Sequence, residues 1–151
     1  MHIKIILALY AILFSATISA QGRNDHSTWD MVANKNTTAI HVNTDAFNSD
    51  ADFRFHIMKI LKQLGYEFSL EPNAIITKDK IIFNNIHAII TVTIEDLHNC
   101  IITGQESTPA IGGLAWKEIK KGPDPIGSPA YEKLLVISEV LHAKKILYSR
   151  N

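Results

Sequence analysis

The segment from Ile86 to Ser107, IHAIITVTIEDLHNCIITGQES, constrains the fold of this chain more than any other stretch. Successive side chains of an extended strand point to opposite faces, so residues two apart share a face. From Ala88 to Ile94 every second residue is alanine or a branched aliphatic, and the residues between them include Thr91 and Thr93. This period of two, rich in β-branched residues, predicts a strand with one aliphatic face.

The residues after this strand predict its return. Residues 96–99, Asp-Leu-His-Asn, are suited to a turn, because Asn99 tolerates a left-handed backbone conformation. An extended run resumes at residues 100–103, Cys-Ile-Ile-Thr. We therefore predict a long β-hairpin whose aliphatic face must be covered by a helix or by another sheet.

A helix that can cover this face is predicted at residues 50–64. Ser49 precedes it as an N-cap, and the acidic side chains of Asp50 and Asp52 favour the positive end of the helix dipole. Apolar residues then recur at spacings of three and four, which places them on one side of the helix. Gly65 follows as a C-cap.

A second helix is predicted at residues 129–143. Ser128 is its N-cap, and Pro129 takes the first helical position, where the missing amide costs nothing. Between Leu134 and Leu141, apolar residues extend around more of the circumference than in the first helix. Such a helix is usually buried on more than one side.

Several short extended runs surround the hairpin and the helices. Strands are predicted at residues 37–43, 66–70, 74–77, 81–83, 114–119 and 146–148, with loops at 108–113 and 120–127. Consecutive strands joined by local turns imply antiparallel pairing. We therefore predict an α+β fold, in which an antiparallel sheet of four to six strands packs against the helices 50–64 and 129–143 as a two-layer sandwich.

Residues 1–20 have the three regions of a secretory signal peptide: a single cation, an apolar run at 5–14 and small residues before Ala20. We expect cleavage after Ala20, with cuts after Ala16 or Ser19 as alternatives. A membrane anchor is the other interpretation, but the run is shorter than the roughly 20 residues that a spanning helix needs. The mature chain is expected to be secreted or periplasmic, with no transmembrane span.

The mature chain is expected to comprise a leader and one domain. Residues 21–36 are polar and predict a flexible leader, in which Trp29 and Met31 are possible docking points. Residues 37–151 are enough for a single α+β domain and too few for two.

Charge and cysteine content exclude several classes of protein. Loss of Lys4 with the signal peptide lowers the 15 basic residues to 14, against 15 acidic ones, so the mature net charge is −1 with neutral histidines. No basic field is present for nucleic acid or anionic lipid. Cys100 is the only cysteine, so no intrachain disulfide can form. This pattern fits a bacterial periplasmic or secreted domain that depends on its apolar core.

One constellation near the hairpin turn could support chemistry. Glu95, Asp96, His98 and Cys100 bring carboxylate, imidazole and thiol groups within six residues, and a hairpin tip could direct them to a metal. Structural zinc sites pair two separated ligand clusters, however, and the chain has no second Cys/His cluster. The ordinary interpretation of this segment is turn formation and solvation.

Nucleophilic catalysis by Cys100 would require a base and an orienting group close to the thiol. The candidate bases are His41, His56, His87 and His98. No local signature surrounds Cys100, and a lone cysteine in a β-rich run is usually a small core residue. The chain has no glycine-flanked serine elbow, and its Gly112-Gly113 and Gly122-Pro123 pairs predict turns instead of phosphate loops. We assign no catalytic, cofactor-binding or metal-ligating residue and expect no cofactor.

The layout and two short phrases carry a family resemblance. The phrases are LKQLGYEF, at the end of the first predicted helix, and KKILYS, near the C-terminus. With the order of elements over residues 37–148, they resemble small secreted proteins of unknown function from Bacteroidota. Some of those have a β-α-β-β-β-β-α arrangement like the TATA-binding-protein repeat. The resemblance implies a fold and an envelope location, and transfers no catalytic residue. The chain lacks the basic sheet face of nucleic-acid-binding relatives.

The sequence favours a non-enzymatic binding or assembly module of the bacterial cell envelope or secreted space, with another envelope or secreted protein as its partner. Such a module would use the uncovered face of the sheet or an aromatic groove, because amphipathic aromatic residues are common at interfaces. The groove candidates, which ordinary packing would also explain, are Trp29, Trp116, Tyr131 and Tyr148. The alternative is a small secreted enzyme or metal-binding protein with its site near Glu95, Asp96, His98 and Cys100.

Overall fold

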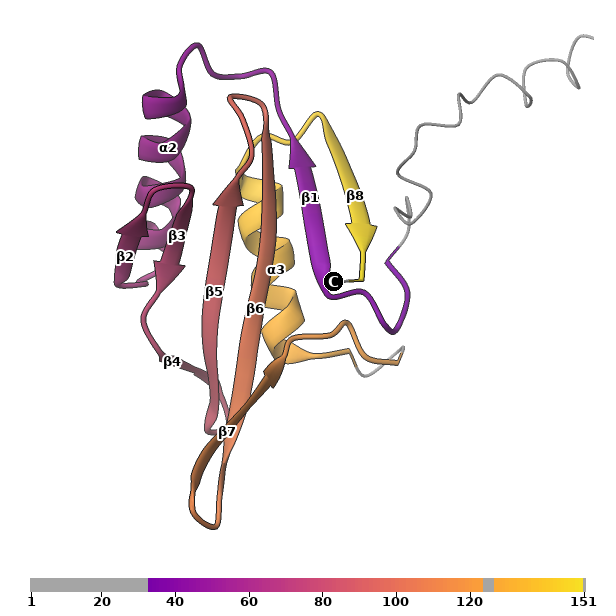
Figure 1. Cartoon of the computed structure of the whole chain (residues 1–151). Coiled ribbons are helices and arrows are strands. Elements are labelled where there is room, and N and C mark those ends of the chain that lie inside the picture. The colour runs from indigo at the N-terminus through magenta and orange to yellow at the C-terminus, as the bar shows by residue number, and fades with distance from the viewer. Residues whose placement is uncertain (1–32, 124–126, 151) are drawn as a thin grey trace, which may run out of the picture.

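The predicted hairpin is the longest strand pair of the computed structural model, which describes residues 33–123 and 127–150 (Figure 1). Strand β5 (Ile86–Ile94) pairs antiparallel with β6 (Asn99–Ala110), in a register that runs from His87 opposite Ser107 to Ile94 opposite Cys100. The prediction of a long hairpin is confirmed. Every other strand contacts this pair directly or through one neighbour.

The two long strands are long enough to hold two short strands each. Strands β3 (Ala74–Thr77) and β4 (Lys80–Phe83) pair with successive parts of β5, and β1 (Ala39–Asn43) and β7 (Gly113–Glu118) pair with successive parts of β6. The edges beyond β3 and β1 are completed by β2 (Phe68–Glu71) and β8 (Lys145–Ser149).

The described residues therefore form one antiparallel sheet of eight strands that does not close into a barrel. The predicted α+β class is confirmed, whereas the predicted number of four to six strands is too low. The difference arises because β3 and β4 share one edge of the hairpin and β1 and β7 share the other. If each edge of the hairpin is assumed to pair with only one strand, the number of strands in the sheet is underestimated.

Both described helices pack on the same face of the sheet, as the two-layer prediction required (Figure 1). Helix α2 (Asp50–Gln63) begins at Ser49, whose Oγ accepts a hydrogen bond of 3.1 Å from the amide of Asp52. Helix α3 (Pro129–Val140) begins at Ser128, whose Oγ accepts from the amide of Tyr131 at 3.3 Å. These bonds satisfy amides that would otherwise have no partner in the first turn.

The outer side of α3 differs from its prediction. Val136 and Val140 are 37% and 42% exposed, so burial on more than one side is wrong for this part of the helix. Leu134, Ile137 and Leu141 are fully buried against the sheet and α2. The helix has one buried side because the sandwich has only two layers.

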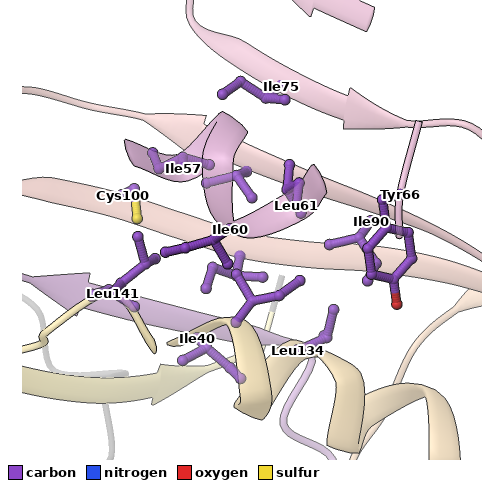
Figure 2. Packing of buried hydrophobic residues seen from close by; sticks show 14 of the residues in the cluster. Ile40, Ile57, Ile60, Leu61, Tyr66, Ile75, Ile90, Cys100, Leu134 and Leu141 are labelled. Carbon is purple, nitrogen blue, oxygen red and sulfur yellow. The ribbon is translucent and has the colours of Figure 1, made fainter. Parts of the chain in front are cut away.

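The core lies between the helices and one face of the sheet (Figure 2). Alternate residues of the central strands point into it, and these side chains are fully buried, including Ile40, Ile75, Ile90 and Ile102. Ile57 meets them from α2. Burial of one such side chain stabilises the fold by about 1.5–3 kcal/mol, so this apolar layer can stabilise a domain that has no disulfide.

The opposite face of the sheet has no helix over it within the described part of the chain. We call its central side chains the open face: Ile76, Ile89, Thr91, Thr93, Ile101 and Thr103. Each of them is half-buried. The register places Thr91 between Ile76 of β3 and Thr103 of β6, so these three side chains form a row across the strands.

The segment after the hairpin differs from its prediction. Residues 108–113 were expected to form a loop, but β6 continues to Ala110 and returns directly as β7. Ile111 and Gly112 form the turn, and Gly112 and Gly113 have φ values of +102° and +121°, which side chains rarely tolerate. The strand extends this far because β7 supplies hydrogen-bonding partners, although Thr-Pro-Ala has little strand pattern of its own.

Predictions for the N-terminal residues 1–32, which include the signal peptide and most of the leader, lie outside the described residues. The end of the predicted leader is held by hydrogen bonds to its carbonyl groups: Lys121 Nζ donates to Ala33 at 3.0 Å, and the amide of Gly122 donates to Lys35 at 3.2 Å. Among the described helices, neither is long and apolar enough to cross a bilayer.

Gly104 provides a test of the packing between β6 and the helices. A Cβ atom at Gly104 would lie 2.8 Å from the carbonyl oxygen of Ile89 and 2.7 Å from Cδ1 of Ile119. The Ile119 side chain can move, but the β5 backbone cannot move without disturbing the hairpin. Gly104→Ala is expected to lower the free energy of unfolding by about 1–3 kcal/mol, measured by urea denaturation.

The exposed neighbour Gln105 supplies the control for this test. Gln105→Ala should change the free energy of unfolding by no more than about 0.5 kcal/mol. An unchanged denaturation midpoint in Gly104→Ala would contradict the close approach of β5 and β6 at this position.

Candidate functional site

The acidic part of the predicted constellation builds the turn between β5 and β6. Asp96 accepts hydrogen bonds from the amide of His98 at 2.7 Å and from Nδ2 of Asn99 at 2.9 and 2.8 Å. The hydrogen bond from Asn99, followed by that from His98, lowers the pKa of Asp96. The amide of Glu95 closes the turn by donating to the carbonyl of Asn99 at 2.9 Å. The role of the Asp96 carboxylate in this structure is therefore to hold the turn together.

Cys100 lies on the other side of the backbone from this turn chemistry. Its side chain is 1% exposed, and its sulfur points among core residues that include Ile57, Ile60 and Leu141 (Figure 2). Burial, and then the charge of Glu95, raise the pKa of the Cys100 thiol to about 12. A nucleophilic cysteine needs a lowered pKa and access to substrate, and Cys100 has neither.

The four residues of the predicted site therefore do not gather around one point. Glu95, Asp96 and His98 are exposed at the turn, whereas Cys100 is buried. No group of three or more His, Cys, Asp or Glu side chains among the described residues could hold a metal ion.

The candidate bases for Cys100 have other neighbours. Nε2 of His41 lies 2.7 Å from Oγ of Ser149, and Nδ1 of His87 lies 2.9 Å from the carboxylate of Asp79. His56 packs against Phe47 and His142, with ring centroids 5.0 and 5.8 Å away. In the described structure, none of these imidazoles is hydrogen-bonded to the thiol.

A shallow hollow of about 310 Å³ does exist beside the turn. Its lining comprises Asn43, Thr44, Asp45, Asp96, Leu97, His98, Asn99 and Lys144. Its charged groups are already paired, because Lys144 Nζ lies 2.8 Å from Asp45 and Asp96 bonds within the turn. The hydrogen bond from Lys144, and then its charge, lower the pKa of Asp45. The Asp45 and Asp96 carboxylates and the Lys144 ammonium of this hollow therefore already have hydrogen-bonding partners within the fold.

The predicted aromatic groove is not assembled from the described aromatic residues. Tyr131 is 2% exposed on α3, and burial, followed by the nearby Tyr148, raises its pKa. Trp116 is half-buried on β7, opposite Ser107 of β6. Trp29 lies outside the described residues. Ordinary packing explains Tyr131, so the aromatic residues define no common site.

The open face carries the better candidate. A hollow of about 360 Å³ lies on it and extends toward β7, lined by Ile76, Ile89, Thr91, Thr103, Gly104, Gln105 and Glu118. Isoleucine and threonine side chains there combine apolar surface with hydroxyl groups that can donate and accept. Glu118 is the one charged residue of the lining. Such a surface can contact another molecule through apolar packing and hydrogen bonds.

The sequence indicated an uncovered sheet face but not this hollow. Thr91 and Thr103 could be assigned to that face from the period of two in the hairpin. Ile76 and Glu118 could not, because their positions depend on how β3 and β7 pair with the hairpin.

Comparison with known proteins returned no relative. No protein-family model, no curated protein and no solved structure matches the chain. The resemblance to Bacteroidota proteins and to the TATA-binding-protein repeat therefore stays a prediction.

The burial of Cys100 predicts a very slow reaction with thiol reagents in the folded protein. At pH 8, Ellman's reagent should modify the native thiol only through unfolding, whereas the chain in guanidinium chloride should react within minutes. A matched control places the thiol on the surface, in the double variant Cys100→Ala/Gln105→Cys, which should react rapidly while folded. Rapid labelling of native Cys100 would contradict its place in the core.

His56 predicts a loss of stability in mild acid. Burial, and then the nearby charge of His142, lower the pKa of His56 from its ordinary value of 6.5. The unfolded chain then binds a proton more readily than the folded one, so this contribution is complete above pH 6.5 and is lost as the pH falls below it. Urea denaturation between pH 7.5 and 5 should show a falling free energy of unfolding.

Substitution of His56 tests whether this residue causes the pH dependence of the free energy of unfolding. His56→Phe should make the free energy of unfolding less dependent on pH across this range. His98→Gln, at the exposed turn, should leave the dependence as in the original chain. An unchanged slope in His56→Phe would exclude His56 as its source.

Proposed function

We propose that this chain is a non-enzymatic binding or assembly module of the bacterial cell envelope or secreted space, and that it binds a partner protein with its open face. The observation that carries the proposal is the one-sided covering of the sheet. Both described helices lie on one face, and the other presents a row of isoleucine and threonine residues with a hollow in it.

The chemistry of the open face favours a protein as the partner. Ile76 and Ile89 are half-buried aliphatic side chains that a partner could cover. Each Å² of apolar surface buried in this way would stabilise the complex by about 25 cal/mol. The hydroxyl groups of Thr91 and Thr103 would supply hydrogen bonds within the same contact. Glu118 at the margin disfavours a phosphate backbone, which basic side chains would have to meet.

The non-enzymatic part of the proposal is supported by the candidate constellation. Its thiol is buried with a raised pKa, and its aspartate is used to form the turn. These contacts disfavour a metal-binding or catalytic role near Glu95, Asp96, His98 and Cys100. The cellular location depends on the export signal predicted at residues 1–20.

A charged side chain in the centre of the open face tests the proposal. Thr91→Arg should lower recovery of the partner by on the order of tenfold when the tagged protein is used for affinity capture from the envelope fraction of its own organism. The arginine would remain solvated in the free protein but would have to be buried unpaired in the complex.

Glu139→Arg, on the exposed side of α3, is the matched control for the added arginine and should capture as the original chain does. Thermal denaturation of both variants verifies that they are folded. Equal recovery by Thr91→Arg and the original chain would exclude the open face as the binding surface.

A further inference from the structure

The end of the β6–β7 hairpin is an exposed apolar projection. Residues 109–115, Pro-Ala-Ile-Gly-Gly-Leu-Ala, contain no side chain that can form a hydrogen bond, and all of them are exposed. Ile111 is 110% exposed and Leu114 is 39% exposed. The hairpin extends past the other strands, so its tip stands away from the body of the domain (Figure 1). We call residues 109–115 the arm tip.

The backbone of the arm tip is held in place up to its turn. Ala110 pairs with Gly113, and Pro109 pairs with Leu114. The two large side chains are therefore presented on a paired β-hairpin, and little additional backbone entropy would be lost when they bind. An aliphatic residue at such a tip is a convex anchor for a concave apolar site.

A concave apolar site lies elsewhere on the same molecule. The groove between the end of α2, β4 and α3 has a volume of about 170 Å³. It is lined by Leu64, Tyr66, Lys80, Ile81, Ile82, Lys133 and Val136. Ile81 and Val136 are 57% and 37% exposed, so aliphatic surface remains in contact with water at this groove. We call it the α2–β4–α3 groove.

The ammonium group of Lys80, which lines this groove, already has partners in its own chain. Its Nζ donates to the carbonyls of Leu64 at 2.8 Å and Gly65 at 3.0 Å, and lies 4.4 Å from the centre of the Tyr66 ring. Lys80 thereby satisfies carbonyl groups that the end of α2 leaves open. An apolar side chain could enter the groove without removing a partner from Lys80.

We propose that the chain associates with itself head to tail, with Ile111 and Leu114 of one copy seated in the α2–β4–α3 groove of the next copy. The arm tip contributes no residue to the groove of its own chain. Convex and concave apolar surfaces on different parts of one molecule make a heterologous contact, in which each copy can use both surfaces. This inference does not depend on the open face or its partner.

A second copy fits the arm tip better than a lipid surface. Two large aliphatic side chains bury less apolar surface than a single myristoyl chain, which by itself gives only marginal membrane binding. In the groove, the same side chains would meet a lining in which Leu64, Ile81, Ile82 and Val136 stand beside Tyr66 and two lysines. The contact is small, so the association is expected to be weak and to depend on protein concentration.

The test is the molar mass of the purified mature protein, measured by sedimentation equilibrium at protein concentrations up to about 1 mM, in the millimolar range expected of weak contacts. The mass of the original chain should rise with concentration past that of a dimer, because a heterologous contact leaves a free tip and a free groove at the ends. Ile111→Asp, which breaks the tip, and Val136→Asp, which breaks the groove, should each remain monomeric.

Mixing the two variants separates this proposal from other modes of association. The intact tip of Val136→Asp should enter the intact groove of Ile111→Asp, which gives a dimer of one copy of each variant and nothing larger. Ile81→Asp, a second groove variant on β4, replaces Val136→Asp if the latter is unfolded. Phe55→Asp removes an exposed aromatic residue of α2 that does not line the groove, and it should associate as the original chain does.

Three results would overturn the proposal. The first is a monomer at every concentration. The second is association of Ile111→Asp alone to the same extent as the original chain. The third is a monomer that binds phosphatidylcholine vesicles through Ile111, which would assign the arm tip to lipid. None of these results depends on capture of a partner by the open face.

Discussion

The pairing of β5 with β6 is the interaction on which the rest of the structure depends. Its register, from His87 opposite Ser107 to Ile94 opposite Cys100, decides which side chains of both strands face the helices. A slip of one residue would exchange the two faces of the strand that moved and expose its aliphatic side chains. Every other strand takes its place from an edge of this pair, so an error in its register would affect the whole sheet.

The same pairing separates the residues that stabilise the domain from those of the proposed binding surface. One set of alternate residues, including Ile90 and Ile102, is fully buried and forms the core. The other set, including Thr91 and Thr103, is half-buried and lines a hollow. The outer set can therefore vary in chemistry with little cost to the core.

Local features of the chain account for what could be predicted. The helix starts were predictable because Ser49 and Ser128 cap them, and the hairpin because its residues alternate. The continuation of β6 to Ala110 could not be predicted, because its pairing with β7 overrides weak local preferences. The core position of Cys100 was predictable because a lone cysteine in a β-rich run is usually buried. Ile76 and Glu118, in contrast, join the open-face hollow only through long-range pairing.

The position of β1 has a consequence for how the chain matures. This first strand lies between β6 and the last strand, and its His41 contacts Ser149, 108 positions later in the chain. The residues of β8, up to Ser149, must therefore be synthesised before the sheet can be completed, and contacts this distant in sequence form slowly. Until β8 has been synthesised, the edge of β1 opposite β6 therefore has no strand to pair with.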